Sequence, residues 1–156
     1  MSTSGSNFQI VVPGASTSVD EWRRAMAAPV SELPPLTDAQ KDVARKFKVT
    51  QEEYARNVLA SAYGRDRMRK RAQDLGEAVQ AVLQSVDPRC RVIAVIRDLD
   101  RLGWMIRVET PPKDIGVLVS QELVDDLLGS GAEREKERLR MRIVSSLEEA
   151  KLAVSR

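Results

Sequence analysis

Apolar positions recur with a helical period over most of the chain. In five stretches they return every three or four residues, which is the spacing of one face of an α-helix. These stretches predict helices over residues 19–28, 38–47, 51–86, 120–128 and 131–154. On the last of them one apolar stripe is formed by Leu139, Ile143, Leu147, Ala150 and Val154. Gly129 is the expected C-terminal stop of the fourth helix.

The starts of four helices carry the pattern of a capping box, in which Ser or Thr precedes Glu or Gln by three residues. In that motif the hydroxyl accepts from the third helical amide, and the longer side chain returns to the cap residue. The four pairs are Ser18–Glu21, Thr37–Gln40, Thr50–Glu53 and Ser130–Glu133. We therefore expect helices to begin directly after each of these hydroxyl residues.

Between residues 91 and 119 the period changes to that of strands. Residues 91–96 are rich in β-branched side chains, residues 104–110 alternate, and residues 114–119 form a third candidate. Short turn-like joints favour a three-stranded antiparallel meander. Helices, then strands, then helices predict an α+β fold with N-terminal helices that include one long, bent helix, and with two C-terminal helices.

The long pattern over residues 51–86 contains two glycines, Gly64 and Gly76. Each glycine costs a helix about 1 kcal/mol relative to alanine. An unbroken helix of about 36 residues would be about 54 Å long at 1.5 Å per residue, which a compact domain of this size does not cover. We therefore expect a break or bend near Gly64. The alternative is that part of the apolar seam meets a second subunit in a homodimer.

The N-terminal residues 1–17 are rich in Ser, Thr and Gly, with one apolar island at residues 8–12. The island has strand character, so it either packs on its own domain, pairs with a partner's sheet edge, or stays unstructured. We divide the chain into a flexible tail (1–17), a short helix with a Pro-rich linker (18–36) and a single α+β domain (37–156).

Composition narrows the class of protein. The 156 residues are 42% hydrophobic and 31% charged with a net charge of +2, so no overall field draws the protein to nucleic acid or anionic membrane. Cys90 is alone, which excludes an internal disulfide. The start of the chain lacks the pattern of a signal peptide, and no apolar run is long enough to cross a bilayer. We expect a cytoplasmic protein without membrane contact.

Candidate chemistry is sparse. The chain contains no histidine, and Cys90 has no motif partner. The acid pair Asp125–Asp126 is adjacent on a helix, so its carboxylates point apart. We therefore expect no catalytic residues, no cofactor, no metal and no small-molecule substrate, and we predict that the protein is not an enzyme.

Residues 42–57 resemble a helix-turn-helix motif, with a small residue at Ala44 and a four-residue joint. The motif favours glycine in its turn, where this chain has Lys48. Glu52 and Glu53 open the second helix and would repel a DNA backbone. Two capped, packed helices explain this segment better than DNA reading does.

These observations favour a non-catalytic protein–protein interaction module, such as an adaptor, an assembly factor or a regulatory subunit. The candidate partner-binding residues are Phe8, Ile10, Val12 and Trp22. The alternative is a nucleic-acid-binding regulator that uses the helix-turn-helix-like pair and a basic helix. That helix would contribute Arg65, Arg67, Arg69, Lys70 and Arg71.

Overall fold

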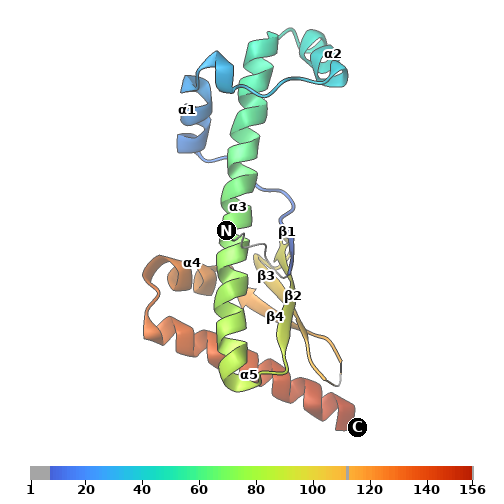
Figure 1. Ribbon diagram of the computed structural model, residues 1–156, viewed down its shortest axis with the longest axis vertical. Helices are drawn as coiled ribbons and strands as arrows, with labels where there is room; N and C mark the ends of the chain where they lie inside the picture. Colours follow the sequence, from blue (N-terminus) through green and yellow to red (C-terminus); the bar gives the residue numbers. More distant parts are fainter. Residues whose placement is uncertain (1–7, 112, 156) are drawn as a thin grey trace. The chain divides into compact units, whose positions relative to one another are not determined.

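The computed structural model describes residues 8–111 and 113–155, with the side chains of residues 152–155 excepted. Its elements are drawn in Figure 1, and the α+β class is confirmed. Along the chain they are β1 (Gln9–Val11), α1 (Val19–Ala27), the short 3-10 helix η1 (Val30–Glu32), α2 (Asp38–Lys46), α3 (Gln51–Val86), β2 (Arg91–Asp98), β3 (Gly103–Glu109), β4 (Ile115–Ser120), α4 (Gln121–Ser130) and α5 (Glu133–Ser155).

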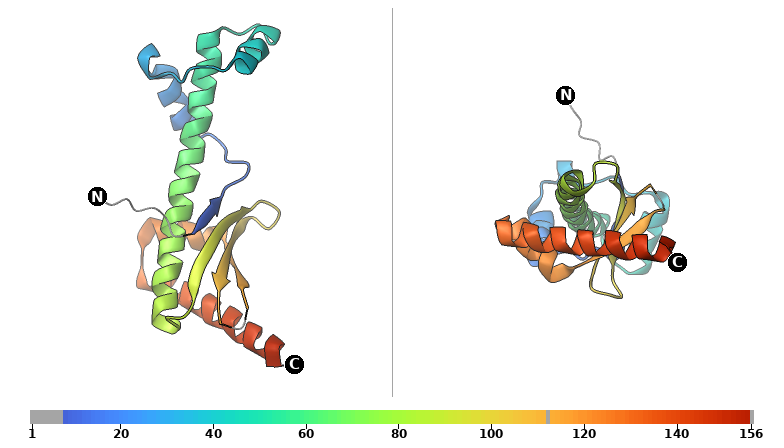
Figure 2. Two further views of the ribbon diagram at one scale, coloured as in Figure 1. Left: turned by 45° about the vertical axis from the view of Figure 1, so that its right-hand side comes forward. Right: turned by 90° about the horizontal axis from the view of Figure 1, so that it is seen from below.

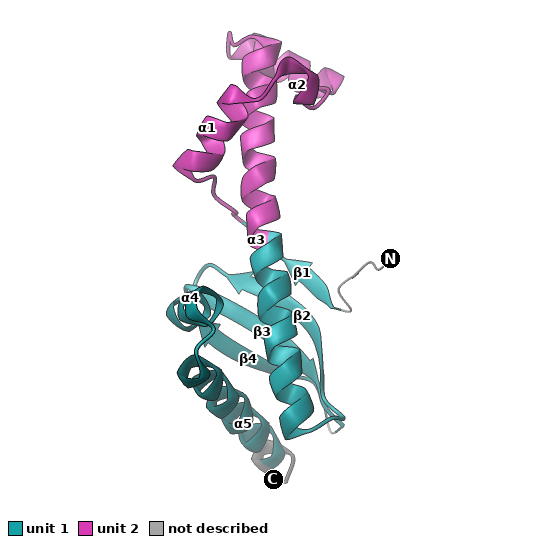
Figure 3. Ribbon diagram, turned by 60° about the vertical axis from the view of Figure 1, so that its left-hand side comes forward, with its two compact units in different colours: residues 1–13, 69–156 teal, residues 14–68 magenta. Residues whose placement is uncertain are grey.

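The described residues form two compact units, coloured separately in Figure 3. Unit 1 takes residues 8–13 together with everything described from residue 69 onward, so it contains the sheet and the C-terminal helices. Unit 2 is residues 14–68 and contains α1, η1, α2 and the first half of α3. Helix α3 thus contributes to both units.

Unit 1 is built on a four-stranded sheet in the order β1-β2-β3-β4. The predicted meander is present, because β2 pairs antiparallel with β3 and β3 pairs antiparallel with β4. In Figure 3 the second half of α3 lies across one face of the sheet. That face carries the fully buried Trp104, Ile106 and Val108 of β3, which alternate with more exposed neighbours as a half-buried strand should.

The predicted count of three strands is wrong, because the apolar island of the tail adds a fourth. Residues 9–11 form β1, which pairs parallel with β2 from Gln9 opposite Ala94 to Val11 opposite Ile96. Before it, the Phe8 ring lies against Gly76 of α3, where an added Cβ would be only 2.2 Å from the ring. The island therefore extends the sheet of its own unit.

The junction of the last two helices also differs from the prediction. Helix α4 continues past Gly129 to Ser130, and Gly131 ends it in the left-handed conformation at φ 62°. The Ser130 hydroxyl donates to the Asp126 carbonyl instead of opening a capping box, and α5 begins at Glu133. Both glycines suit a helix stop, and the structure uses the second one.

The other three capping boxes are confirmed, and all lie in unit 2. The Ser18 hydroxyl accepts from the Glu21 amide at 3.1 Å, and the Glu21 carboxylate accepts from the Ser18 amide at 2.8 Å. The reciprocal bonds also form between Thr37 and Gln40 and between Thr50 and Glu53. Each α-helix of unit 2 therefore begins where the sequence predicts it.

The predicted break near Gly64 is wrong, because α3 is a single helix of 36 residues. Both of its glycines are positions of close approach. A Cβ at Gly64 would lie 2.7 Å from the Ser16 carbonyl oxygen, as one at Gly76 would meet Phe8. The cost of glycine in a helix is accepted here because a side chain would not fit.

Candidate interaction surfaces

Burial in unit 2 differs from that in an ordinary core, because apart from Met68 the buried apolar side chains are alanines and several large ones are exposed. Its buried apolar side chains are Ala25, Ala28, Ala44, Ala55, Ala60 and Met68. Its exposed large apolar side chains are Val19, Trp22, Val30, Val43, Phe47 and Val49. Since alanine buries little apolar area, the hydrophobic gain within this unit is small.

The most exposed aromatic group lies at the end of α2, in a segment that we call the α2 tip (residues 43–49). Phe47 is 76% exposed, and Val43 and Val49 of the same segment are exposed as well. Lys48 adopts a left-handed φ of 57°, which residues other than glycine rarely do. The turn therefore has the conformation in which helix-turn-helix motifs favour glycine, although lysine occupies it.

Basic residues are frequent in and beside this tip in the sequence. Residues 41–48 contain four basic side chains and one carboxylate, Asp42, which pairs with Arg45 at 3.3 Å. The tip is consequently an apolar surface within a locally positive field.

A groove with prolines in its wall provides a second apolar surface in unit 2. Its volume is about 380 Å³, and it is lined by Val30, Leu33, Pro34, Pro35, Leu36, Lys41, Gln51, Glu52 and Ala55. Val30 is among the most exposed aliphatic side chains of the unit. The Pro-rich segment that the sequence presents as a linker thus forms one wall of a concave surface.

Polar contacts to backbone carbonyls attach α1 to α3. Arg56 donates from Nη1 to the carbonyls of Ala25, Met26 and Ala28 at 3.1, 3.0 and 2.6 Å. Its Nη2 also donates to the Glu52 carboxylate at 2.8 Å. These carbonyls lie at the C-terminal end of α1, where a cation donates to them and complements the helix dipole.

The start of α1 is held by a second arginine. Arg67 donates to the Glu21 carboxylate at 2.9 Å and to the Ser16 carbonyl at 2.9 Å. The hydrogen bond from the Ser18 amide, together with Arg67, lowers the pKa of Glu21 below its ordinary value. Between these two anchors the Arg24 guanidinium lies 3.5 Å from the centroid of the Tyr63 ring.

The predicted partner-binding residues are divided between the two units. Phe8 and Ile10 are half-buried within unit 1, where Phe8 contacts Gly76 and Ile10 pairs with Val95. Val12, which follows β1, is also half-buried. Trp22 of α1 is 49% exposed.

The predicted nucleic-acid-binding residues do not form one uncommitted basic patch. Arg67 binds Glu21, Lys70 lies 3.9 Å from Asp74, and Arg71 forms an ion pair with Asp125. Arg65 and Arg69 are exposed. Sequence reasoning missed the pairing of Arg71 because Asp125 is distant in the chain.

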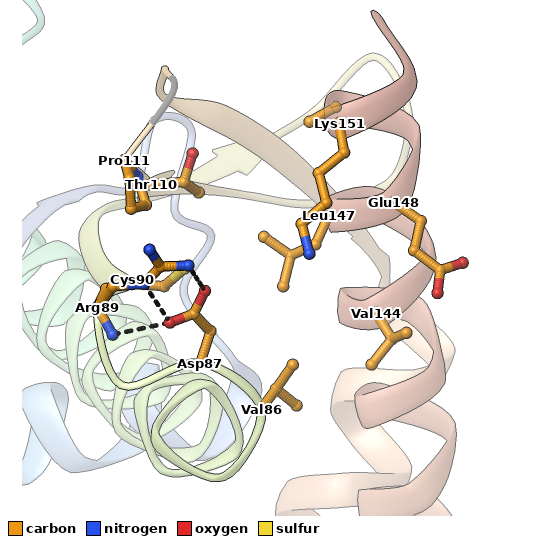
Figure 4. Close-up of a pocket in the computed structure, with 11 residues that line it drawn as sticks. Val86, Asp87, Arg89, Cys90, Thr110, Pro111, Val144, Leu147, Glu148 and Lys151 are labelled. Atoms are coloured by element: carbon orange, nitrogen blue, oxygen red, sulfur yellow. Dashed lines mark hydrogen bonds and ion pairs between the residues drawn. The ribbon is translucent and has the colours of Figure 1, made fainter. Parts of the chain in front are cut away.

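A cavity of about 240 Å³ in unit 1 was not predicted, because three distant segments line it. Figure 4 shows it between the end of α3, the loop after β3 and α5. Its wall includes Val86, Cys90 and Leu147, and its charged groups are Asp87, Arg89, Glu148 and Lys151. The charges of these four groups balance, so the cavity has no excess charge with which to select an ion.

Three pKa shifts in this cavity reflect its local contacts. Side-chain hydrogen bonds from Arg89 lower the pKa of Asp87, and Asp87 raises the pKa of Arg89. Burial raises the pKa of the Cys90 thiol, whose residue is 1% exposed. The thiol is thus held in its unreactive protonated form.

Other kinds of site receive no support from the part of the chain that the structure describes. No cluster of three or more His, Cys, Asp or Glu side chains there is arranged to hold a metal ion. Within the same residues, no helix combines the length and the apolar character that crossing a bilayer requires.

Comparison of the chain with protein-family models, with curated proteins and with solved structures finds no match.

Proposed function

We propose that this protein is a non-catalytic protein–protein interaction module that binds its partner through unit 2. One observation carries the proposal: unit 2 buries alanines and leaves Trp22, Phe47 and several valines exposed. Large apolar side chains that are not used inside a fold are the usual anchors of an interface.

The small size of unit 2 also supports partner binding through its exposed apolar side chains. Burial of apolar surface yields about 25 cal/mol per Å², and domains of about 60 residues are marginal even with ordinary cores. Unit 2 spans residues 14–68 and has an alanine core, so much of its available apolar area stays in water. A partner that covers the α2 tip would bury that area.

The charges near the tip indicate the character of the partner. The exposed Phe47 lies between Lys46 and Lys48 in sequence, with Arg45 nearby. An acidic protein surface with an apolar pocket is complementary to this arrangement, because opposite potentials favour encounter and apolar burial slows dissociation.

Nucleic acid is the second candidate partner, and one observation favours it. The turn at Lys48 has the left-handed conformation of a helix-turn-helix, and an aromatic ring between lysines suits base stacking. The pairing of Arg67, Lys70 and Arg71 with carboxylates weighs against it. Glu52 and Glu53 at the start of α3 also disfavour phosphate contact.

Capture of partners from a native cell extract, with and without nuclease, tests the proposal. We compare the unaltered protein with Phe47→Ala, which truncates the exposed ring. Loss of an aromatic anchor typically costs about 2 kcal/mol or more, so capture of the partner should fall at least tenfold. The partner should remain after nuclease treatment.

Leu102→Ala is the matched control, because Leu102 is 73% exposed but lies in unit 1. It should leave capture unchanged. Equal loss with both variants, or no loss with Phe47→Ala, contradicts the proposal. Loss with nuclease alone favours the nucleic-acid candidate.

A further inference from the structure

One row of apolar side chains crosses the solvent-facing side of the sheet in unit 1. The register places Val11 opposite Ile96, Ile96 opposite Met105, and Met105 opposite Leu118. Side chains alternate between faces, so this row lies on the face opposite the buried Trp104 and Ile106. Every strand contributes one member to the row.

This face of the sheet is partly open to solvent. Val11 is 38% exposed, and Ile96, Met105 and Leu118 are each partly exposed. Beside the row, Arg107 and Gly116 are exposed as well, whereas Ala94 and Gly103 are buried. A water-facing side of an antiparallel sheet is ordinarily polar, which makes an apolar row across all four strands unusual.

The apolar surface continues past the edge strand. A groove of about 590 Å³ lies between β4 and α5, and Leu118 and Met141 are among the residues that line it. Met141 is 64% exposed on α5, near the place where Arg142 donates to the Leu118 carbonyl at 3.0 Å. The left view of Figure 2 shows the sheet with α5 beyond its lower end.

The rows on either side of the apolar row differ in charge and size. On one side Ala94, Arg107 and Gly116 lie opposite one another across the strands. On the other side the register aligns Asp98, Gly103 and Ser120. Arg107 makes the face positive on one side of the row. On the other side Asp98 provides a carboxylate, which also pairs with Arg101 of the following turn at 3.8 Å.

We propose that this face binds a second copy of the chain, with a two-fold axis along the apolar row. Such an axis superposes the row on its counterpart, so that Met105 meets Met105 and Ile96 meets Ile96. It reverses the strand direction and thereby places the row of Arg107 over the row of Asp98. Two sheets packed in this way are about 10 Å apart.

The side chains that would face each other are complementary in size as well as in charge. Arg107 comes to lie over Gly103 of the second copy, with Asp98 one strand, or about 4.8 Å, to the side. Gly116 meets Ser120, and Ala94 meets Asp98. A two-fold axis along the strands would instead bring the Arg107 rows together, which like-charge repulsion opposes. Charge therefore selects one orientation.

Sedimentation equilibrium of the whole protein tests the pairing over about 1–500 µM, the range in which a modest interface is measurable. The average mass should rise from 17.4 kDa toward twice that value. Met105→Glu places two carboxylates on the axis and should weaken association at least tenfold. Phe47→Ala, which lies in unit 2, should leave it unchanged.

A crosslinking experiment tests the position of the axis. With Met105→Cys, the introduced thiols of two copies would face each other and form a disulfide between chains under mild oxidation. Gln84→Cys is the control, because Gln84 is exposed on α3 away from the sheet face. The natural Cys90 is buried and gives little background.

Charge exchange tests the orientation. Arg107→Asp should weaken association, and adding Asp98→Arg should restore it, with circular dichroism confirming that each variant is folded. A protein that stays monomeric at the highest concentration overturns the proposal. So does a dimer that survives Met105→Glu, since it must form elsewhere. Neither result affects partner binding by unit 2, which Phe47→Ala tests separately.

Discussion

Glycine in the long helix shows how one residue type has two opposite interpretations. From sequence, Gly64 and Gly76 weaken a helix and predict a break. In the structure α3 continues through both glycines. Glycine is needed at these positions because Ser16 and Phe8 occupy the space that a side chain would fill. The absence of a Cβ is a packing feature, and it depends on residues about 50 or more positions away in the chain.

A pair of glycine-to-alanine changes separates these two effects. Gly129→Ala should stabilise the protein by up to about 1 kcal/mol, because nothing lies within 4 Å of the added Cβ and alanine favours helix. Gly64→Ala gains the same propensity but places its Cβ 2.7 Å from the Ser16 carbonyl oxygen. We expect a net loss of about 1–2 kcal/mol in the free energy of unfolding.

Chemical denaturation of both variants measures this difference. If Gly64→Ala stabilises the protein as much as Gly129→Ala does, the close approach of Ser16 to α3 is wrong.

At the level of elements, local sequence signals determine where helices begin, whereas tertiary contacts determine which helices pack against each other. Three capping boxes form as predicted because all their atoms lie within four consecutive residues. The capping box at Ser130 does not form because Ser130 is the last residue of α4. The attachment of α1 to α3 depends on Arg56 and carbonyls about 30 positions earlier, which no local pattern indicates.

Loss of the Arg56 side chain should release α1. The group is 15% exposed and donates to three carbonyls, and hydrogen bonds from charged groups contribute about 1.5–3 kcal/mol. Arg56→Ala should lower the stability of unit 2 by about 2 kcal/mol and increase amide exchange in residues 19–27. Arg56→Lys should restore part of the loss, since one ammonium reaches fewer acceptors.

Arg23→Ala is the matched control, because Arg23 is an exposed arginine of α1 itself. Equal exchange in residues 19–27 for both alanine variants would contradict the role given to Arg56.

For the whole molecule, the sequence predicted the helices and the meander, each built from neighbouring residues. It did not predict the contacts between segments that are far apart in the chain. The α+β class, the long helix and the antiparallel meander follow from periodicity. The fourth strand, the cavity beside Cys90 and the apolar row across the sheet depend on register and on residues far apart. The exposure of Phe47 was also missed, because an apolar residue at the end of a helical pattern is normally expected inside.

The two units should differ in local stability, and α3 offers an internal comparison. Its second half buries Leu75, Val79 and Leu83 completely, while its first half buries only alanines and Met68. Amides of residues 51–68 should exchange at least tenfold faster than those of residues 69–86, because opening exposes less apolar surface. Hydrogen exchange followed by mass spectrometry measures both halves at once, and uniform protection along the helix would contradict the alanine-core account.

The parallel pairing of β1 with β2 has a consequence for biosynthesis. Gln9 pairs with Ala94, so the strand that leaves the ribosome first must wait for a partner made about 85 residues later. At about 5–20 residues per second that interval lasts several seconds. During it the nascent chain presents an unpaired β-segment beside Phe8, and factors that bind emerging polypeptides have their best opportunity there.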